Sequence, residues 1–377
     1  MGGTVTSPSP PPGRLTGIDT LRGLSAVAVL VCHIAGYWTF MSLPWKMPQL
    51  MALGAHGVDI FIVISGFVLF LPVVRAMGHL DSKQFYGRRA MRILPAYYLA
   101  LAIAAVLAMG PRTWDLVVAR QATLPELVLH ILGIQTWFPG TLGSINGSLW
   151  SISLELHLYL VFPVLVAIWR RWGMTPLLVG SVALATVWTW SQSLGVSGPV
   201  GFGLGGIHAL PSRLLQFVAG MWCATRLVSS QPLNTRHWAL GMLVFGAAAT
   251  LASTIQLNEV IIHLAWGGLG ACLVLLMCAV RPTGQTVEIS ERFGERAYSF
   301  YLLHQPVLLV LGPVVALLPG WPVQLVVGGT GVFLLVTAFA ALMYRYVELP
   351  THQLGRRLFP SPSQRPAPAP GSRTGGY

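Results

Sequence analysis

Residues 22–33 read RGLSAVAVLVCH, a segment in which an arginine and a histidine enclose ten small or apolar residues. Arg22 and His33 are eleven positions apart. In an α-helix, eleven steps of about 100° make three full turns plus about 20°. The two side chains therefore share one helix face, separated by about 16 Å along the axis. If this helix spans a membrane, that face presents a guanidinium near one end and an imidazole near mid-depth.

The composition indicates that most of the chain lies in a lipid bilayer. Hydrophobic residues make up 54% and charged residues 9% of the sequence, whereas soluble domains carry about 25% charged residues. Several windows exceed the roughly 18 apolar residues that suggest a spanning helix. The sequence predicts an all-α, polytopic membrane protein with about ten transmembrane helices, near residues 18–38, 52–74, 90–109, 148–169, 175–192, 206–228, 237–255, 259–280, 297–318 and 322–346. The segment 114–137, interrupted by Pro125, Glu126 and His130, is expected to be extramembrane or interfacial.

The distribution of basic residues predicts the topology. With ten spans and both termini in the cytoplasm, the lysines and arginines fall on the inner side, with the exceptions Lys46, Arg112, Arg120 and Arg213. The net charge of +12 is then a topology signal with some attraction to anionic membrane lipids, so we expect no nucleic-acid partner. The expected location is the cell membrane, as a multi-pass protein of the bacterial plasma membrane. We expect a disordered tail over residues 1–13, a membrane domain over 14–350 and a cytoplasmic, mostly disordered tail over 351–377.

Polar residues inside the predicted spans are costly in lipid and tend to face a cavity or a partner. By depth they form two zones. The inner zone contains Arg22 and residues 85–92, and the outer zone contains His33, Asp59, Glu155 and Arg213. We treat as further candidate pocket residues Asp59, Ser151, His157, Arg213 and His304. The four cysteines lack a metal-binding spacing, so no metal site is expected.

The inner zone is centred on FYGRRAMR at 85–92. Arg89 and Arg92 are three residues apart and are neighbours on one helix face. A pair of guanidinium groups suits a phosphorylated ligand, because each group can make bidentate contacts to phosphate oxygens. The alternative is an ordinary basic flank whose side chains extend to lipid headgroups.

The outer zone is centred on NGSLWSISLELHLYL at 146–160, where Ser151, Glu155 and Tyr159 recur every four residues. This polar stripe either lines a site or forms hydrogen bonds between helices. Histidine is the side chain best suited to remove a proton near neutral pH. His33 is therefore a candidate general base, with packing against a neighbouring helix as the alternative.

Six segments carry a resemblance to a known family. In chain order they are IDTLRGLSAVAVLVCH, GVDIFIVISGFVLF, FYGRRAMRILPAYY, NGSLWSISLELHLYL, AYSFYLLHQPV and YRYVELP. Together, from about residue 17 to 350, they resemble the acyltransferase-3 family of integral membrane O-acyltransferases, in its stand-alone form without a further hydrolase domain.

The resemblance assigns family positions to residues of this chain. Arg22 and His33 match the family's arginine and essential histidine. Its RxxR element matches Arg89 and Arg92, and its glycine–aspartate segment matches Gly57 and Asp59. Where the family usually has two acidic residues or a glutamate–glutamine pair, this chain has Glu155, Leu156 and His157, which leaves the second polar role without a clear match.

This resemblance implies transfer of an acyl group, commonly acetyl, from a coenzyme A thioester to a hydroxyl. We expect cytoplasmic acyl-CoA (acetyl-CoA) as co-substrate and no bound cofactor. Donor binding falls to Arg88, Arg89 and Arg92, and catalysis to His33 as base with Arg22 and Glu155. The expected acceptor is a cell-surface glycan or glycolipid, and a macrolide-type natural product is the alternative. A polytopic exporter of glycan or lipid would share the helices and the buried polar groups.

Overall fold

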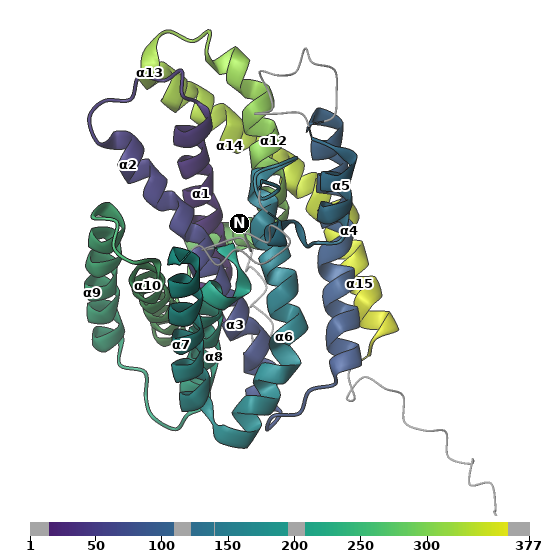
Figure 1. Cartoon of the computed structure of the whole chain (residues 1–377), viewed down its shortest axis with the longest axis vertical. Helices are drawn as coiled ribbons and strands as arrows, with labels where there is room; N and C mark the ends of the chain where they lie inside the picture. Colours follow the sequence, from purple (N-terminus) through teal and green to yellow (C-terminus); the bar gives the residue numbers. More distant parts are fainter. Residues whose placement is uncertain (1–14, 109–121, 139, 195–207, 361–377) are drawn as a thin grey trace, which may run out of the picture.

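The computed structural model describes residues 15–108, 122–138, 140–194 and 208–360. In these ranges the chain is helical and contains no strand (Figure 1), which confirms the all-α prediction. The helices are α1 (Ile18–Tyr37), α2 (Met47–Ala52), α3 (Gly57–Arg75), α4 (Ser82–Ala108), α5 (Leu124–Ile131), α6 (Trp150–Trp172), α7 (Met174–Ser193), α8 (Leu210–Val228), α9 (Thr235–Thr254), α10 (Glu259–Val280), α11 (Gln285–Gly294), α12 (Ala297–Val315), α13 (Gly320–Val323), α14 (Gly329–Met343) and α15 (Leu349–Leu358). Short 3-10 helices are η1 (Leu53–His56), η3 (Gln135–Trp137) and η4 (Gly147–Leu149), and two π-helical turns are η6 (Gln324–Gly328) and η7 (Tyr344–Glu348).

Nine helical segments among the described residues are long and apolar enough to cross a membrane. The tenth predicted span is α8, which is 19 residues long and contains Arg213, Gln216 and Arg226. These polar side chains lower its hydropathy, but α8 packs against α3, α7 and α10 in the interior of the molecule. The multi-pass membrane architecture is therefore confirmed, with α8 enclosed by other helices rather than facing lipid.

The contact between α3 and α8 is unusually close because two glycines face it. A Cβ atom added at Gly66 would lie 2.0 Å from the carbonyl oxygen of Phe217, and one added at Gly220 would lie 2.0 Å from that of Val63. Small residues let the backbones of membrane helices approach closely, which increases dispersion contacts where no hydrophobic effect favours association. Helix α3 is thus packed closely against α8, which also contacts α7 and α10.

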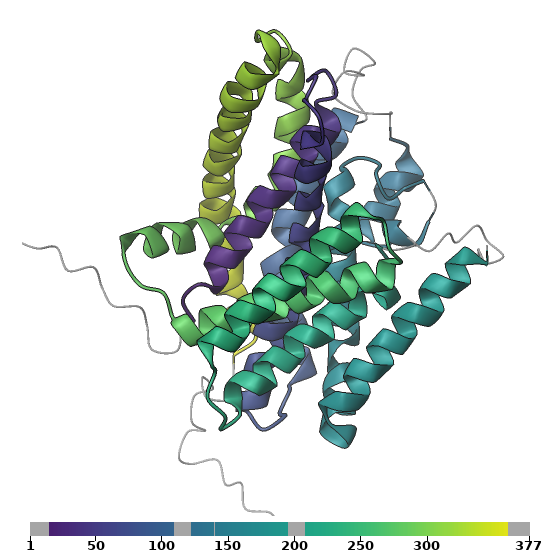
Figure 2. The same cartoon turned by 90° about the vertical axis from the view of Figure 1, so that its left-hand side faces the viewer.

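Helix α1 lies between two groups of helices. Figure 2 shows α7–α10 (teal to green) as one group and α12–α14 (green to yellow) on the far side of α1 (purple). The short helix α11 fixes the start of α1, because the Glu291 carboxylate accepts hydrogen bonds from the backbone N–H of Gly17 (2.8 Å) and Thr20 (3.0 Å). A carboxylate at a helix N-terminus satisfies unpaired N–H groups and complements the helix dipole. This cap sets the position of Arg22 one turn further on.

The C-terminal segment from Gly320 to Leu358 is a continuous helical run of 39 residues. Two π-helical turns, η6 and η7, interrupt its α-helical geometry. Residues 351–358, which the sequence placed in a mostly disordered tail, form most of α15, and α15 packs against α4. The N-terminal tail and the rest of the C-terminal tail lie outside the described residues, apart from residues 359 and 360.

The segment predicted to leave the membrane includes α5, and its residues 114–121 lie outside the described ranges. Helix α5 begins with a capping box, in which the backbone N–H of Thr123 donates to the Glu126 carboxylate at 2.7 Å. His130 is fully buried, and its Nδ1 lies 2.8 Å from the carbonyl oxygen of Glu126. Burial disfavours the charged imidazole, so the pKa of His130 lies below its ordinary value.

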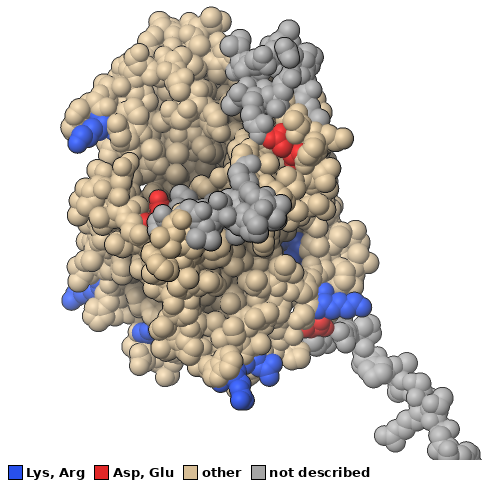
Figure 3. Space-filling model, in the orientation of Figure 1, with Lys and Arg blue, Asp and Glu red and all other residues tan. Residues whose placement is uncertain are grey.

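The surface has the character expected for lipid contact. On the face in Figure 3, the lysines and arginines lie mostly toward the lower end, and the surface above them carries few charged side chains. Large apolar side chains such as Leu240, Leu243, Val179 and Val187 are exposed on α9 and α7. An apolar exposed belt with charge toward one end is typical of a protein whose middle faces hydrocarbon.

Candidate active site

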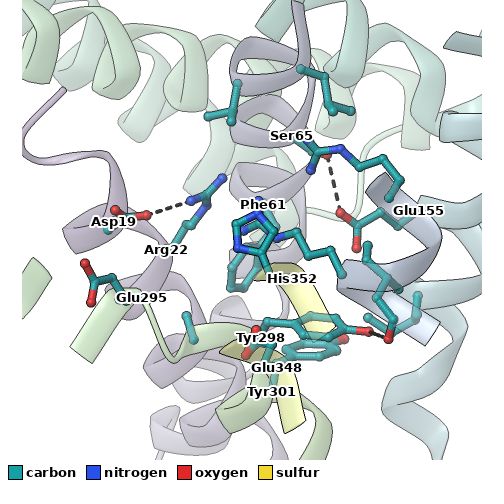
Figure 4. Close-up of a pocket in the computed structure, with 18 of the residues that line it drawn as sticks. Asp19, Arg22, Phe61, Ser65, Glu155, Glu295, Tyr298, Tyr301, Glu348 and His352 are labelled. Atoms are coloured by element: carbon teal, nitrogen blue, oxygen red, sulfur yellow. Dashed lines mark hydrogen bonds and ion pairs between the residues drawn. The ribbon is translucent and has the colours of Figure 1, made fainter. Parts of the chain in front are cut away.

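A cavity of about 580 Å³ lies where α1, α3, α4, α6, α12 and α15 meet (Figure 4). Its wall contains both apolar and polar side chains, and α3 contributes mainly apolar ones. The polar lining residues are Asp19, Arg22, Ser65, Arg89, Arg92, Ser151, Glu155, Tyr159, Glu295, Tyr298, Tyr301, Tyr344, Glu348, His352 and Arg356. The cavity therefore gathers side chains that are more than 330 residues apart in sequence.

Three arginines of the predicted inner zone face the cavity. Arg22, Arg89 and Arg92 all line it. Arg22 donates to Asp19 at 2.6 Å, and the guanidinium of Arg89 lies 5.6 Å from the centre of the Tyr159 ring. These contacts orient both arginines at the cavity wall.

Arg88, the third predicted donor-binding residue, does not line the cavity. Its Nε donates to the carbonyl oxygen of Phe359 at 2.7 Å, just beyond the end of α15. Consecutive residues of a helix point about 100° apart, so Arg88 and Arg89 cannot face the same space. The structure separates a pair of cavity arginines from an arginine that fastens α15 to α4.

Helix α15 adds basic groups that the sequence prediction missed. His352 and Arg356 line the cavity together with Tyr344 and Glu348. These four residues recur every fourth position, so they share one face of the helical run through η7 and α15. The signal was present in the sequence as a polar stripe, but the stripe lies partly beyond the predicted last span and in the predicted tail.

The predicted polar stripe of α6 faces the same cavity. Ser151, Glu155 and Tyr159 all line it. Tyr159 donates to Glu155, and Ser65 of α3 donates to the same carboxylate at 3.5 Å. The structure thus brings Glu155 to the arginines of the inner zone rather than into a separate outer zone.

His33 does not line this cavity. Its Nδ1 lies 2.7 Å from Nε2 of His304, and the Nδ1 of His304 lies 2.5 Å from the carbonyl oxygen of Tyr301. Tyr301 does line the cavity, and its ring centre is 5.2 Å from that of His304. In the part of the chain that the structure describes, the hydrogen-bonding partner of His33 is therefore His304, whereas Glu155 bonds Tyr159 and Ser65.

The start of α6 and the middle of α12 hold this region together. Pro306 has no N–H, so the carbonyl oxygen of Leu302 lacks its usual helical partner, and Asn146 donates to it at 3.3 Å. Gln305 accepts from the backbone N–H of Ser148 at 2.7 Å. Ser151 donates to the hydroxyl of Tyr301 at 2.7 Å. These bonds fix Tyr301 between the cavity and the two histidines.

Asp59 and Arg213 form a separate buried cluster. Arg213 of α8 donates to Asp59 of α3, and Gln216 donates to the same carboxylate at 2.8 Å. His56 Nδ1 lies 2.5 Å from the second carboxylate oxygen. Neither Asp59 nor Arg213 lines the cavity, so the structure assigns this pair to the contact between α3 and α8. Opposite charges inside a membrane domain commonly pair in this way.

His157 is the remaining predicted pocket residue. It accepts a hydrogen bond from the indole N–H of Trp137 at 3.0 Å, and Trp137 is exposed. His157 does not line the cavity, because it points away from the face of Ser151, Glu155 and Tyr159.

Similarity to known proteins shows the family of this chain. A family model described as an acyltransferase domain matches residues 15–345. The chain belongs to the acyltransferase-3 family. It is 26% identical to acyltransferase MdmB of Streptomyces mycarofaciens over 324 residues, which cover 77% of this chain and 78% of that protein. No solved structure matches the chain significantly.

Two further relatives are longer than the region they share with this chain. Peptidoglycan O-acetyltransferase OatA of Listeria monocytogenes is 24% identical over 389 residues, which cover 90% of this chain and 56% of that protein. Nodulation protein 10 of Rhizobium leguminosarum is 27% identical over 201 residues, covering 49% of this chain and 53% of that protein. The chain therefore spans little more than half the length of these two relatives. Family membership identifies it as a membrane acyltransferase.

Proposed function

We propose that this protein transfers an acyl group, in the simplest case acetyl, from cytoplasmic acyl-CoA to a hydroxyl of a cell-surface glycan or glycolipid. The observation that carries the proposal is the cavity in which Arg22, Arg89, Arg92 and Arg356 meet. Coenzyme A carries a pyrophosphate and a further phosphate, and guanidinium groups bind phosphate through paired, charge-assisted hydrogen bonds.

The size of the cavity supports a small organic ligand. Its volume of about 580 Å³ falls within the roughly 300–1,000 Å³ that is usual for such sites. The lining includes the arginines of α4 and α15 as well as the apolar residues Val58, Phe61 and Ile62 of α3. We therefore place the phosphates beside the arginines and the thioester toward Tyr301.

In the proposed reaction, His33 acts as the general base. The acceptor hydroxyl oxygen attacks the thioester carbonyl carbon while its proton passes to the unprotonated ring nitrogen of His33. The new C–O bond forms, the C–S bond breaks, and the thiolate leaves as coenzyme A and takes up the proton from His33. A positioned base of this kind contributes about 10²–10⁴-fold to rate.

A glycan acceptor is supported by the relatives rather than by the cavity. Three relatives are named as O-acetyltransferases of peptidoglycan or as O-acetyltransferase OatA. A sugar polymer offers many hydroxyl groups outside the membrane, and His33 lies toward the end of α1 opposite to Arg22, about 16 Å further along the helix axis. The donor and acceptor would then approach from opposite sides of the bilayer.

The test compares wild-type protein with His33→Gln in lipid nanodiscs. Wild-type protein supplied with acetyl-CoA and a cell-surface glycan extract should release free coenzyme A and yield acetylated glycan by mass spectrometry. His33→Gln keeps a hydrogen-bonding group but cannot take the proton, so turnover should fall by at least about 10²-fold. A variant that retains more than a third of wild-type turnover would show that the base lies elsewhere.

A further inference from the structure

His33 and His304 form a hydrogen-bonded pair whose protons can be assigned from the geometry. The His33 Nδ1 and His304 Nε2 atoms are 2.7 Å apart. The ring planes are within 4° of each other and their centres are 4.9 Å apart. A short N···N distance with a longer centre separation means that the rings meet edge to edge, so a lone pair of one ring points at the N–H of the other.

The far end of His304 decides which nitrogen carries each proton. Its Nδ1 lies 2.5 Å from the Tyr301 carbonyl oxygen, and a carbonyl oxygen can only accept a hydrogen bond. His304 Nδ1 must therefore be protonated. His304 is fully buried, and charging a buried imidazole is unfavourable. In the neutral ring the other nitrogen, Nε2, is then an acceptor.

The proton assignment of His304 also determines that of His33. Because His304 Nε2 accepts, His33 Nδ1 must donate, and a neutral His33 then carries its free lone pair on Nε2. His33 is half-buried, in contrast to the enclosed His304. His33, the less buried of the two rings, therefore carries the unprotonated nitrogen that is not used in the hydrogen bond between them.

We propose that His304 is a positioning residue that fixes His33 in the Nδ1-protonated tautomer, so that Nε2 is the atom that accepts the proton from the acceptor hydroxyl. The inference deepens the proposed function and rests on it for the catalytic role of His33. After proton transfer, His33 is an imidazolium whose Nδ1–H bond to neutral His304 becomes charge-assisted, which favours the charged intermediate. His304 itself neither gains nor loses a proton.

The Tyr301 carbonyl is available for this purpose because of the chain's local geometry. Tyr301 and His304 are three residues apart on α12, so the imidazole can fold back onto the preceding turn. The Tyr301 side chain is fixed separately, since its hydroxyl accepts from Ser151 at 2.7 Å and donates to the Ser148 carbonyl at 3.1 Å. The residue whose carbonyl orients the two imidazoles is therefore held by η4 and α6 through its side chain.

The direct test is nitrogen-15 NMR of histidine-labelled full-length protein in lipid nanodiscs, with the His33 signals assigned by their loss in His33→Gln. Wild-type protein should show His33 protonated at Nδ1 and unprotonated at Nε2. In His304→Leu, which removes the acceptor, both tautomers of His33 should appear. A wild-type His33 that is protonated at Nε2 would overturn the proposal whatever the activity.

Kinetics supply the second readout. At equal amounts of folded protein, His304→Leu should lower kcat by about 10- to 100-fold and change KM for acetyl-CoA less than about twofold, because the cavity arginines are untouched. His304→Gln can place an amide oxygen near the former Nε2 and should recover part of the lost kcat. Unchanged kcat in His304→Leu would overturn the positioning role.

His130→Leu is the matched control. His130 is also fully buried and also has its Nδ1 at a backbone carbonyl oxygen, 2.8 Å from Glu126, but it lies on α5 away from the cavity. Its replacement should leave kcat per folded molecule unchanged; an equal loss in both variants would overturn the proposal. If NMR shows the expected tautomer but His33→Gln stays active, the proton assignment stands and the proposed catalytic function fails.

Discussion

Replacing Arg89 by alanine tests whether the cavity arginines bind phosphate. Arg89 lines the cavity and is held beside Tyr159, 5.6 Å from its ring. A hydrogen bond between charged groups contributes about 1.5–3 kcal/mol. At 1.4 kcal/mol per tenfold change in affinity, the KM for acetyl-CoA should rise about 10- to 150-fold. Because a contact to the coenzyme A phosphates would be the same in the ground state and the transition state, kcat should fall much less than KM rises.

Arg88→Ala is the internal control for this experiment. It removes the same charge from the adjacent position of the same helix, so any general effect on topology or on lipid contact is matched. The Arg88 side chain instead donates to the Phe359 carbonyl at 2.7 Å. Its replacement should change KM for acetyl-CoA less than about threefold, since surface-type contacts contribute little.

The donor can be varied together with the protein. S-acetylpantetheine carries the same thioester without the nucleotide phosphates, so it should be a poor donor for wild-type protein and an equally poor one for Arg89→Ala. The assay is release of free thiol in nanodiscs at equal protein abundance. If Arg89→Ala weakens use of both donors by the same factor, or if Arg88→Ala matches it with acetyl-CoA, Arg89 does not contact phosphate and the reasoning is refuted.

Two further predictions concern topology and packing. Gly143→Cys should react with a membrane-impermeant maleimide on intact cells, whereas Ser82→Cys should react only after permeabilisation. Both positions are exposed, and the charge distribution places them on opposite sides of the membrane. The reverse labelling pattern would show the opposite topology. Gly220→Ala would place a Cβ 2.0 Å from the Val63 carbonyl and should destabilise the fold by about 1–3 kcal/mol, seen as a lower Tm in detergent. Gly180→Ala, where no atom lies within 4 Å of the new Cβ, should not; equal Tm values would contradict the close approach of α3 and α8.

The helices themselves were predictable from the sequence, because the bilayer imposes one dominant requirement. A long apolar run must satisfy its backbone hydrogen bonds internally and therefore forms a helix. The predicted span 18–38 corresponds to α1 (Ile18–Tyr37), and 259–280 to α10 (Glu259–Val280). The prediction was less complete after residue 346, where α15 is amphipathic and apolarity no longer marks the helix.

The site was predictable only as separate residues. Helical periodicity placed Ser151, Glu155 and Tyr159 on one face and Arg89 and Arg92 on another, and both faces line one cavity. Periodicity relates residues within a helix, but it carries no information about which faces of different helices meet. The assignment of Glu155 to an outer zone apart from the arginines was therefore wrong.

Pairing across helices was decided by the tertiary structure alone. The sequence identified Asp59 and Arg213 as costly charges in the membrane, and packing of α3 on α8 turned them into an ion pair away from the cavity. The sequence likewise identified His33 and His304, 271 residues apart, but not that they hydrogen-bond. The cost of burying a polar group is a local property that a sequence reveals. The partner that offsets this cost by a hydrogen bond or an ion pair is determined by how the helices pack. That packing depends on the shapes of the side chains along the whole length of each helix.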